Sequence, residues 1–181
     1  PELAAEKLAV KDINDAGGVL GNKITTVDAD TSDADHADQN TSSAQSVLAK
    51  NPSVVVGPPS SSVVKNTYKQ VTSAKVPMIS SGATSTAFSG LSDYFFRTIP
   101  PDTVQGAVLG QIIAQDGVKN LAIAVFNDEY GTSLRDVVVK TVEDAGVNVV
   151  YGEKDTFDPT ETNFSSMVTA IKATNPDATL V

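Results

Sequence analysis

The fold class follows most directly from Val54-Val55-Val56-Gly57-Pro58-Pro59-Ser60-Ser61-Ser62, an apolar run that ends in a turn and a row of serines. A short β-branched run bounded by Gly and Pro is typical of a strand covered on both faces. Serine is favoured as the N-cap of a helix, because its hydroxyl accepts a bond from a backbone N–H that otherwise lacks a partner. The stretch therefore predicts a buried strand, a tight turn and a helix start.

The predicted helix start allows two interpretations. The free N–H groups of the first turn, with the positive end of the helix dipole, are suited to bind an anion such as a carboxylate. Alternatively, the serines only cap the helix of an ordinary βα loop. Capping serines are more common than anion sites, so this stretch by itself favours the capping interpretation.

Helices and strands alternate along the rest of the chain. Apolar residues at helical spacing predict a first helix that ends near residue 16 and another that follows the serines. The same spacing predicts helices over 37–48, 104–112, 134–145 and 164–171. Apolar or β-rich runs predict strands over 23–28, 54–57, 76–79, 94–98, 121–126, 147–151 and 178–181. Parallel strands need a crossover, so this alternation predicts an α/β fold with parallel sheets flanked by helices.

Pro100-Pro101 marks a predicted crossing between two lobes, because neither residue can donate a backbone hydrogen bond and each fixes φ. We expect a first ligand-binding lobe over 1–100 and part of a second over 101–181. The first helix has no strand before it, although a βαβ fold starts with one at the centre of its sheet. We therefore expect the chain to be a fragment of a longer protein, with the missing strand between 23–28 and 54–57.

Composition excludes several classes of partner. The chain has 181 residues, is 40% hydrophobic and carries a net charge of −9, so it lacks the basic face that nucleic acid or an anionic membrane surface requires. No apolar run is long enough for insertion into a membrane. With no cysteine, the chain has no disulfide and no thiolate nucleophile. The chain opens at Pro1 inside a helical pattern, as a mature protein without its signal peptide or a trimmed chain would.

Metal, cofactor and catalytic motifs are not supported. The acidic run over 28–38 would need Gly and Glu at the sixth and twelfth positions of an EF-hand, where Asp33 and Gln39 stand. A Ser-His-Asp triad would have to use His36, the only histidine, and there is no G-x-S-x-G elbow. The two glycine motifs that bind nucleotide phosphates, G-x-x-x-x-G-K-[ST] and G-x-G-x-x-G after a strand, are both absent from the sequence. A binding protein without metal or cofactor is therefore preferred to an enzyme.

Polar segments follow three of the predicted strands, namely 60–62, 80–84 and 127–131. In an open parallel sheet, ligands bind beyond the carboxyl ends of the strands. Small hydroxyls, a glycine and an aromatic ring are suited to binding, with no nucleophile and base among them. The alternative is that 80–84 is an ordinary polar loop and Tyr130 a partly buried surface residue.

Five segments together resemble, in the same order, the leucine/branched-chain amino-acid binding proteins, which are the solute receptors of ABC importers. They are Ala9–Lys23, Val56–Ser62, Pro77–Thr84, Phe96–Asp102 and Glu129–Gly131. Each segment is weak evidence by itself, whereas five in order are specific. The resemblance implies a type I periplasmic-binding-protein fold, in which two Rossmann-like lobes joined by a hinge close on a small ligand.

The resemblance also implies a ligand-binding set, which is Ser60, Ser61, Gly82, Ala83, Thr84, Asp102 and Tyr130. Ser60 and Thr84, with backbone N–H groups around Gly82, are expected to bind the α-carboxylate of the ligand. Asp102 is expected near its ammonium group. Tyr130 is expected to close over the ligand from the second lobe.

The implied function is that of a periplasmic or cell-surface receptor that hands a branched-chain or similar amino acid to the membrane permease of an ABC transporter. Members of the family also bind amides, urea and aromatic acids, and they are about twice this length, as two full lobes require. The later residues, including the main carboxylate partner expected for an ammonium group, are absent here. One alternative is a ligand-sensing domain of a receptor or regulator. Another is a hydrolase, which requires a base within hydrogen-bond reach of Ser60.

Overall fold

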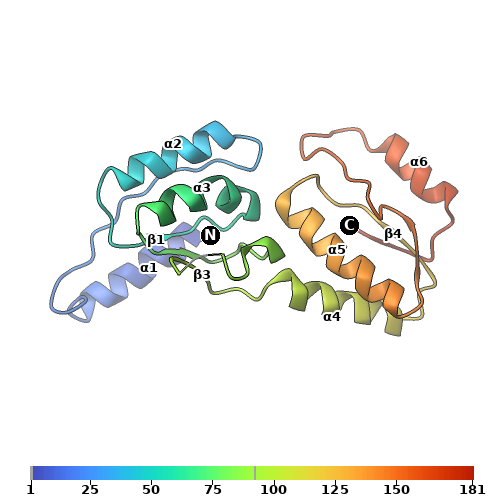
Figure 1. Cartoon of the computed structure of the whole chain (residues 1–181), viewed down its shortest axis with the longest axis horizontal. Helices are drawn as coiled ribbons and strands as arrows, with labels where there is room; N and C mark the ends of the chain where they lie inside the picture. Colours follow the sequence, from blue (N-terminus) through green and yellow to red (C-terminus); the bar gives the residue numbers. More distant parts are fainter. Residues whose placement is uncertain (1, 92) are drawn as a thin grey trace.

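Two α/β units lie side by side in the computed structural model, which describes residues 2–91 and 93–181 (Figure 1). Each unit contains a parallel three-stranded sheet, in the order β1-β2-β3 in the first unit and β5-β4-β6 in the second. The predicted α/β class with parallel sheets and flanking helices is therefore confirmed.

The first unit ends with the strand that precedes Pro100-Pro101. Its elements are α1 (Glu2–Asp15), α2 (Ala37–Leu48), β1 (Val55–Val56), α3 (Ser61–Ser73), β2 (Met78–Ser80), the 3-10 helix η1 (Thr86–Phe88) and β3 (Phe95–Arg97). Val55 lies opposite Met78, and Met78 lies opposite Phe95. The central strand β2 thus carries the ladders of both neighbours.

The second unit begins directly after the prolines. Its elements are α4 (Asp102–Gln115), β4 (Asn120–Ile123), α5 (Glu129–Asp144), β5 (Asn148–Tyr151), α6 (Ser165–Ala173) and β6 (Ala178–Leu180). Leu121 on the central strand β4 lies opposite Val149 on one side and Ala178 on the other. Every helix among the described residues is too short or too polar to cross a membrane.

Each sheet has its own hydrophobic core. In the first unit, Met78 packs with Val64 and Val71 of α3. In the second unit, odd and even residues of β4 serve opposite faces, as the strand period requires. Leu121 and Ile123 pack against α5. Ala122, with Ala124 directly after the strand, packs against α6. The division into two ligand-binding lobes at 100/101 stays a prediction, which the separate cores support.

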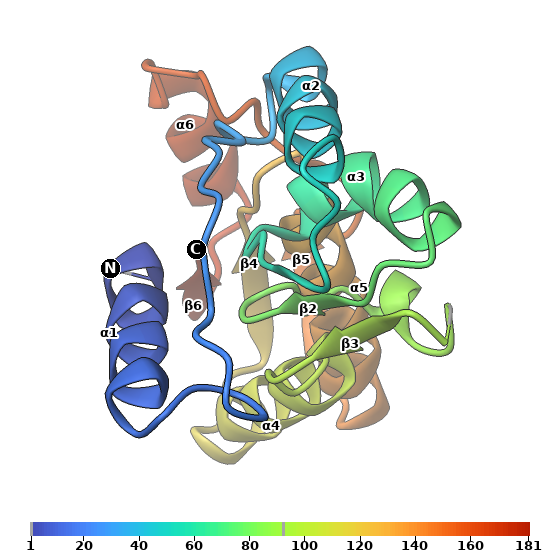
Figure 2. The same cartoon turned by 90° about the vertical axis from the view of Figure 1, so that its left-hand side faces the viewer.

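The strand predicted over 23–28 is wrong, because these residues form no strand. A segment is a β-strand only if its backbone forms hydrogen bonds with a neighbouring strand. Among the described strands, β1 pairs only with β2, so its other edge does not pair with residues 23–28. Val27 and Val56 are each 52% exposed, so neighbouring residues do not fully cover these apolar side chains. Helix α1 has no buried residue, and residues 23–35 run between it and the sheet (Figure 2). Residues 23–28 do not pair with β1, so the expected intervening strand stays a prediction.

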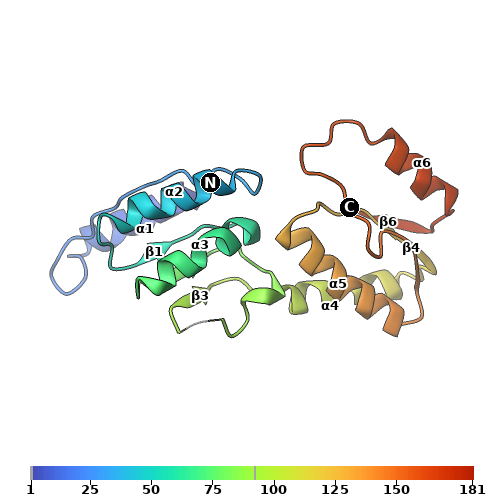
Figure 3. The same ribbon diagram turned by 45° about the horizontal axis from the view of Figure 1, so that its top comes forward.

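Helices α4 and α5 lie side by side in the second unit because two glycines face α5 (Figure 3). A Cβ on Gly106 would lie 2.7 Å from the Cβ of Val137, and one on Gly110 would lie 2.7 Å from the Cβ of Thr141. Both separations are shorter than any normal contact between side chains. Glycine therefore sets the distance between the two helix axes at this point.

We expect Gly106→Ala to lower the free energy of unfolding by about 1–3 kcal/mol, because overpacking outweighs the roughly 1 kcal/mol by which Ala is the better helix former. Urea unfolding followed by circular dichroism measures the change. The control is Gln111→Ala on the exposed side of α4, which should leave stability unchanged or slightly raised. Equal stability of Gly106→Ala and the wild type would show that the helices have room to move apart.

Candidate functional site

Two loops meet at the carboxyl edge of the first sheet, because the parallel neighbours β1 and β2 end at the same edge. A Cβ on Gly82 would lie 2.9 Å from the carbonyl oxygen of Pro59, so the loops touch with no room for a side chain. The Ser80 hydroxyl donates to the Pro58 carbonyl at 2.6 Å and accepts from the Ala83 N–H at 3.1 Å. Ser80, which is fully buried, therefore ties the two loops together.

The serines at the start of α3 have different partners. The sequence predicts a serine cap for this helix, and the structure shows that it is Ser60, whose Oγ accepts from the Val63 N–H at a long 3.5 Å. The Ser61 Oγ accepts instead from the Ser85 N–H at 3.3 Å, which brings the second loop against the helix start. The hydroxyl of Ser60 is thus weakly held and half-exposed, whereas Ser61 is buried and bonded to the neighbouring loop.

Four buried oxygens near these loops have no hydrogen-bond partner among the described residues. They are the hydroxyls of Ser81 and Thr84 and both carboxylate oxygens of Asp102. Asp102 is fully buried, Thr84 is 5% exposed, and the Asp102 N–H donates to the Thr84 carbonyl at 2.8 Å. Buried polar atoms nearly always have partners in folded proteins. This set therefore contains unfilled donor and acceptor positions, which mark it as the candidate site.

Arg97 supports the loop that carries Ala83 and Thr84. Its Nη1 donates to the carbonyls of Ala83 at 3.2 Å and Ser85 at 2.8 Å, and its Nη2 donates to the Ser89 hydroxyl at 2.7 Å. Burial lowers the pKa of Arg97 below its ordinary value, and the negative charge of Asp102 opposes this shift. The sequence places Arg97 only within the Phe96–Asp102 segment and does not by itself predict that it supports the loop. The one signal for this role was the presence of an arginine in a short predicted strand.

Tyr130 lies in the first turn of α5 rather than in the loop predicted after the strand. The helix starts early because the Asp128 carboxylate caps it and accepts from the Gly131 N–H at 2.6 Å. A Cβ on Gly131 would lie 2.6 Å from the Phe126 carbonyl, so glycine allows the first turn of α5 to pack directly against the segment that follows β4. Tyr130 is 39% exposed, and its hydroxyl accepts from Gln105 of α4 at 3.0 Å. The hydrogen bond from Gln105 thus ties the Tyr130 ring to the second unit.

The predicted set is therefore brought together only in part. Ser61, Ala83 and their neighbours form one bonded pair of loops, and the backbone bond to Thr84 adds Asp102. Tyr130 lies on α5, whose first residue, Glu129, donates its N–H to the Ser62 hydroxyl at 3.1 Å. Two surface grooves of about 560 and 450 Å³, on α5 and α4, share no lining residue with this set.

A family model described as periplasmic binding protein matches residues 1–181. The chain belongs to the periplasmic binding protein family. The curated relatives include the leucine-, isoleucine-, valine-, threonine- and alanine-binding protein of Pseudomonas aeruginosa, which is 33% identical over 174 residues. That match covers 94% of this chain and 45% of the relative. The resemblance found in the sequence is thereby confirmed at the level of the family.

Solved structures show the same fold. A leucine-binding protein from Thermotoga maritima has a TM-score of 0.85 at 19% identity, over 94% of this chain and 48% of that one. A branched-chain amino acid transporter substrate-binding protein from Streptococcus pneumoniae, in complex with isoleucine, has a TM-score of 0.81 at 27% identity, over 96% and 49%. The predicted type I periplasmic-binding-protein fold is therefore confirmed, and this periplasmic binding protein chain spans about half the length of these relatives.

The acidic segment over 28–38 serves turns in this periplasmic binding protein. The Asp30 carboxylate accepts from the Ser32 N–H at 2.8 Å, and the Asp33 carboxylate accepts from the Asp35 N–H at 3.1 Å. Within residues 2–91 and 93–181, no group of three His, Cys, Asp or Glu side chains could hold a metal ion. The Nδ1 of His36 lies 2.6 Å from Asp33 Oδ1, and this hydrogen bond raises the pKa of His36 above 6.5.

We expect the valine substitution Thr84→Val to raise the free energy of unfolding of the ligand-free protein by about 1 kcal/mol, because it replaces a buried hydroxyl without a partner by a methyl group of similar shape. Urea unfolding checks this. In the matched control Thr67→Val, the lost hydroxyl donates to the Val63 carbonyl at 2.7 Å, so this variant should be destabilised. If Thr84→Val is destabilised as much as the control, the Thr84 hydroxyl has a protein partner.

We expect the single histidine to titrate above pH 6.5 in the folded protein, and Asp33→Asn to return its pKa toward 6.5. A raised folded pKa means that the His36–Asp33 contact contributes stability below the unfolded pKa and loses it as the pH rises through the folded value. NMR titration of the imidazole resonances measures the pKa. Asp38→Asn in the same segment is the control, and equal shifts in both variants would contradict the assignment to Asp33.

Proposed function

We propose that this chain is part of the solute-binding receptor of an ABC importer, acting outside the cytoplasmic membrane and binding an amino acid between two lobes. The observation that carries the proposal is the group of buried oxygens at Thr84 and Asp102, which have no partner within residues 2–91 and 93–181 and lie near the start of α3. These lie beyond the carboxyl ends of parallel strands, where open α/β sheets bind ligands. The family membership supports the same role, and no catalytic step is needed to explain the site.

A zwitterion fits the chemistry of these groups. The carboxylate of Asp102 only accepts hydrogen bonds, so it favours a ligand group that donates, such as an ammonium. A ligand carboxylate is favoured instead by hydroxyls and by the N–H groups at the start of α3. A simple carboxylic acid would leave Asp102 without a donor and add a second negative charge, which is unfavourable in a buried site. An amino acid is therefore preferred, and the relatives named for leucine, isoleucine and valine favour a branched-chain one.

The proposed lobes are residues 1–100 and 101–181, which residues 98–101 connect between β3 and α4. Closing of the lobes would exclude water and strengthen each polar contact with the ligand. In this arrangement Ser60, Ser61, Gly82, Ala83 and Thr84 bind the ligand from the first lobe. Asp102 binds it from the start of α4, directly after the crossing, and Tyr130 covers it from α5. The loaded receptor would then deliver the ligand to the membrane permease of its transporter.

We expect Ser60→Ala to weaken leucine binding by about 1–3 kcal/mol in the intact protein that contains this chain, the usual loss for a hydrogen bond to a charged group. Isothermal titration calorimetry with leucine, well below the unfolding temperature, measures it. The control is Ser73→Ala at the exposed far end of α3, which should bind as the wild type does. Unchanged affinity in Ser60→Ala would remove Ser60 from the site, and absence of leucine binding in the wild type would refute the proposed ligand.

A further inference from the structure

Glu129, the first residue of α5, contacts the first unit at three points. Its Oε1 accepts from the Ser85 hydroxyl at 2.7 Å, and its Oε2 accepts from Lys65 Nζ at 2.6 Å. Its backbone N–H donates to the Ser62 hydroxyl at 3.1 Å. Ser62 and Ser85 each adjoin a residue of the proposed ligand set. One residue of the second unit is therefore bonded to both loops that form the site in the first.

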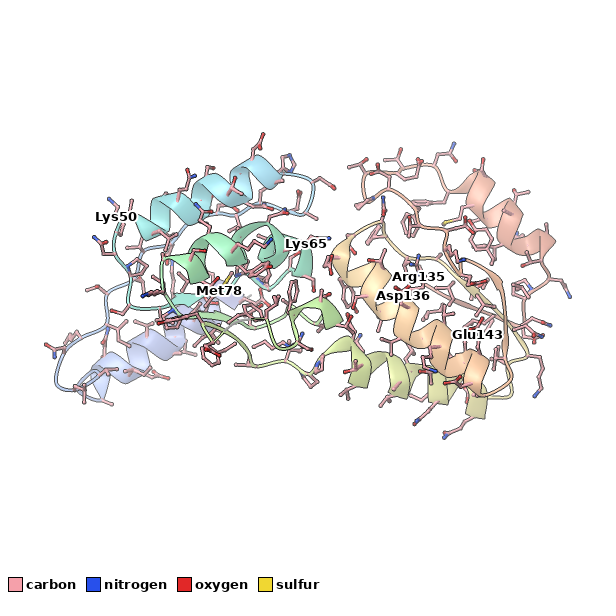
Figure 4. The ribbon with its side chains drawn as sticks, viewed as in Figure 1. Lys50, Lys65, Met78, Arg135, Asp136 and Glu143 are labelled. Carbon is pink, nitrogen blue, oxygen red and sulfur yellow. The ribbon has the colours of Figure 1, made fainter. Side chains whose placement is uncertain are left out.

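A second contact lies one turn further along α5. The Ser133 hydroxyl accepts from the Thr86 N–H at 3.0 Å, and Ser133 itself is buried. The start of α5 thus covers residues 85 and 86, which directly follow Thr84. Figure 4 shows Lys65 on the side of α3 that faces α5. The contact between the units is accordingly concentrated at the loop that carries part of the site.

The Glu129 carboxylate keeps its hydrogen bonds only while the two units stay in contact. Its side chain is 14% exposed, whereas that of Lys65 is 63% exposed. Among the described residues, both donors to its carboxylate belong to the first unit. A carboxylate taken from water is stable only while its donors are present. Separation of the units would remove both donors and return Glu129 to solvent.

We propose that Glu129 is a positioning residue that holds the two units against each other and fixes the Thr84–Thr86 loop for ligand binding. The crossing at residues 98–101 supplies the freedom to open, and the Glu129 contacts supply the opposing restraint. The effect on ligand binding rests on the proposed function. The effect on the separation of the units does not, so the two can be measured apart.

The closure test uses the ligand-free intact protein. This chain has no cysteine of its own, so spin labels can be attached within it through Lys50→Cys on the first unit and Lys172→Cys on α6 of the second, with any cysteine outside this chain replaced first. We expect Glu129→Gln to shift the electron–electron distance distribution to longer values. The control Glu143→Gln, on the exposed surface of the same helix, should match the wild type. An unchanged distribution in Glu129→Gln overturns the proposal.

The exposed partner Lys65 provides a second variant whose folding is not at risk. Lys65→Met should shift the distances in the same direction, and the double variant with Glu129→Gln should shift them no further than Glu129→Gln does, because both act on one contact. Lys69→Met on the same helix is the matched control. Full additivity of the two single shifts would overturn the pairing.

Leucine affinity separates the two levels of the proposal. Glu129→Gln should weaken leucine binding about tenfold, as expected when one charged contact of the closed state is lost, and Glu143→Gln should leave it unchanged. If the wild type binds no leucine but Glu129→Gln still shifts the distances, the proposed ligand fails and the restraint by Glu129 stands. If the distances shift and leucine binds equally well to both, Glu129 does not position the site.

Discussion

The parallel pairing of β1 with β2 is the constraint on which the proposed site depends. Val55 and Val56 lie opposite Met78 and Ile79, so both strands end at the same edge. The serines before α3 and the loop after β2 consequently meet, although they are far apart in the sequence. Gly82 then allows the two loops to touch, because any side chain there would collide with Pro59. The first unit is built to bring two polar segments into direct contact.

The loops combine satisfied and unsatisfied polar groups. Ser80 and Ser61 use their hydroxyls to join one loop to the other, and Arg97 donates to carbonyls of the second loop. These bonds fix the backbone of the two loops. The oxygens of Thr84 and Asp102 remain without partners in the described residues. A pre-formed loop with unfilled positions lowers the entropy lost on binding, which is the advantage of preorganisation.

Most elements could be predicted from local pattern, and the errors have physical causes. The strand predicted over 23–28 has suitable residues, but a strand also needs a neighbour, and none of the described strands lies beside it. Helix α5 begins earlier than its apolar spacing indicates, because Asp128 caps it and its first turn is polar. Both errors concern hydrogen bonds, namely strand pairing and helix capping, which the spacing of apolar residues does not reveal.

The sequence by itself determined the parallel α/β class, a serine cap at the start of the helix after 54–57, the absence of cysteine and metal motifs, and the family resemblance. Each of these depends on residue type and short spacing. Only the tertiary structure decided that Ser61 bonds to the opposite loop, that Asp102 is buried with no donor among the described residues, and that Glu129 joins the units. These depend on groups that lie far apart along the chain and meet only after the sheets form, so no local pattern of residues encodes them.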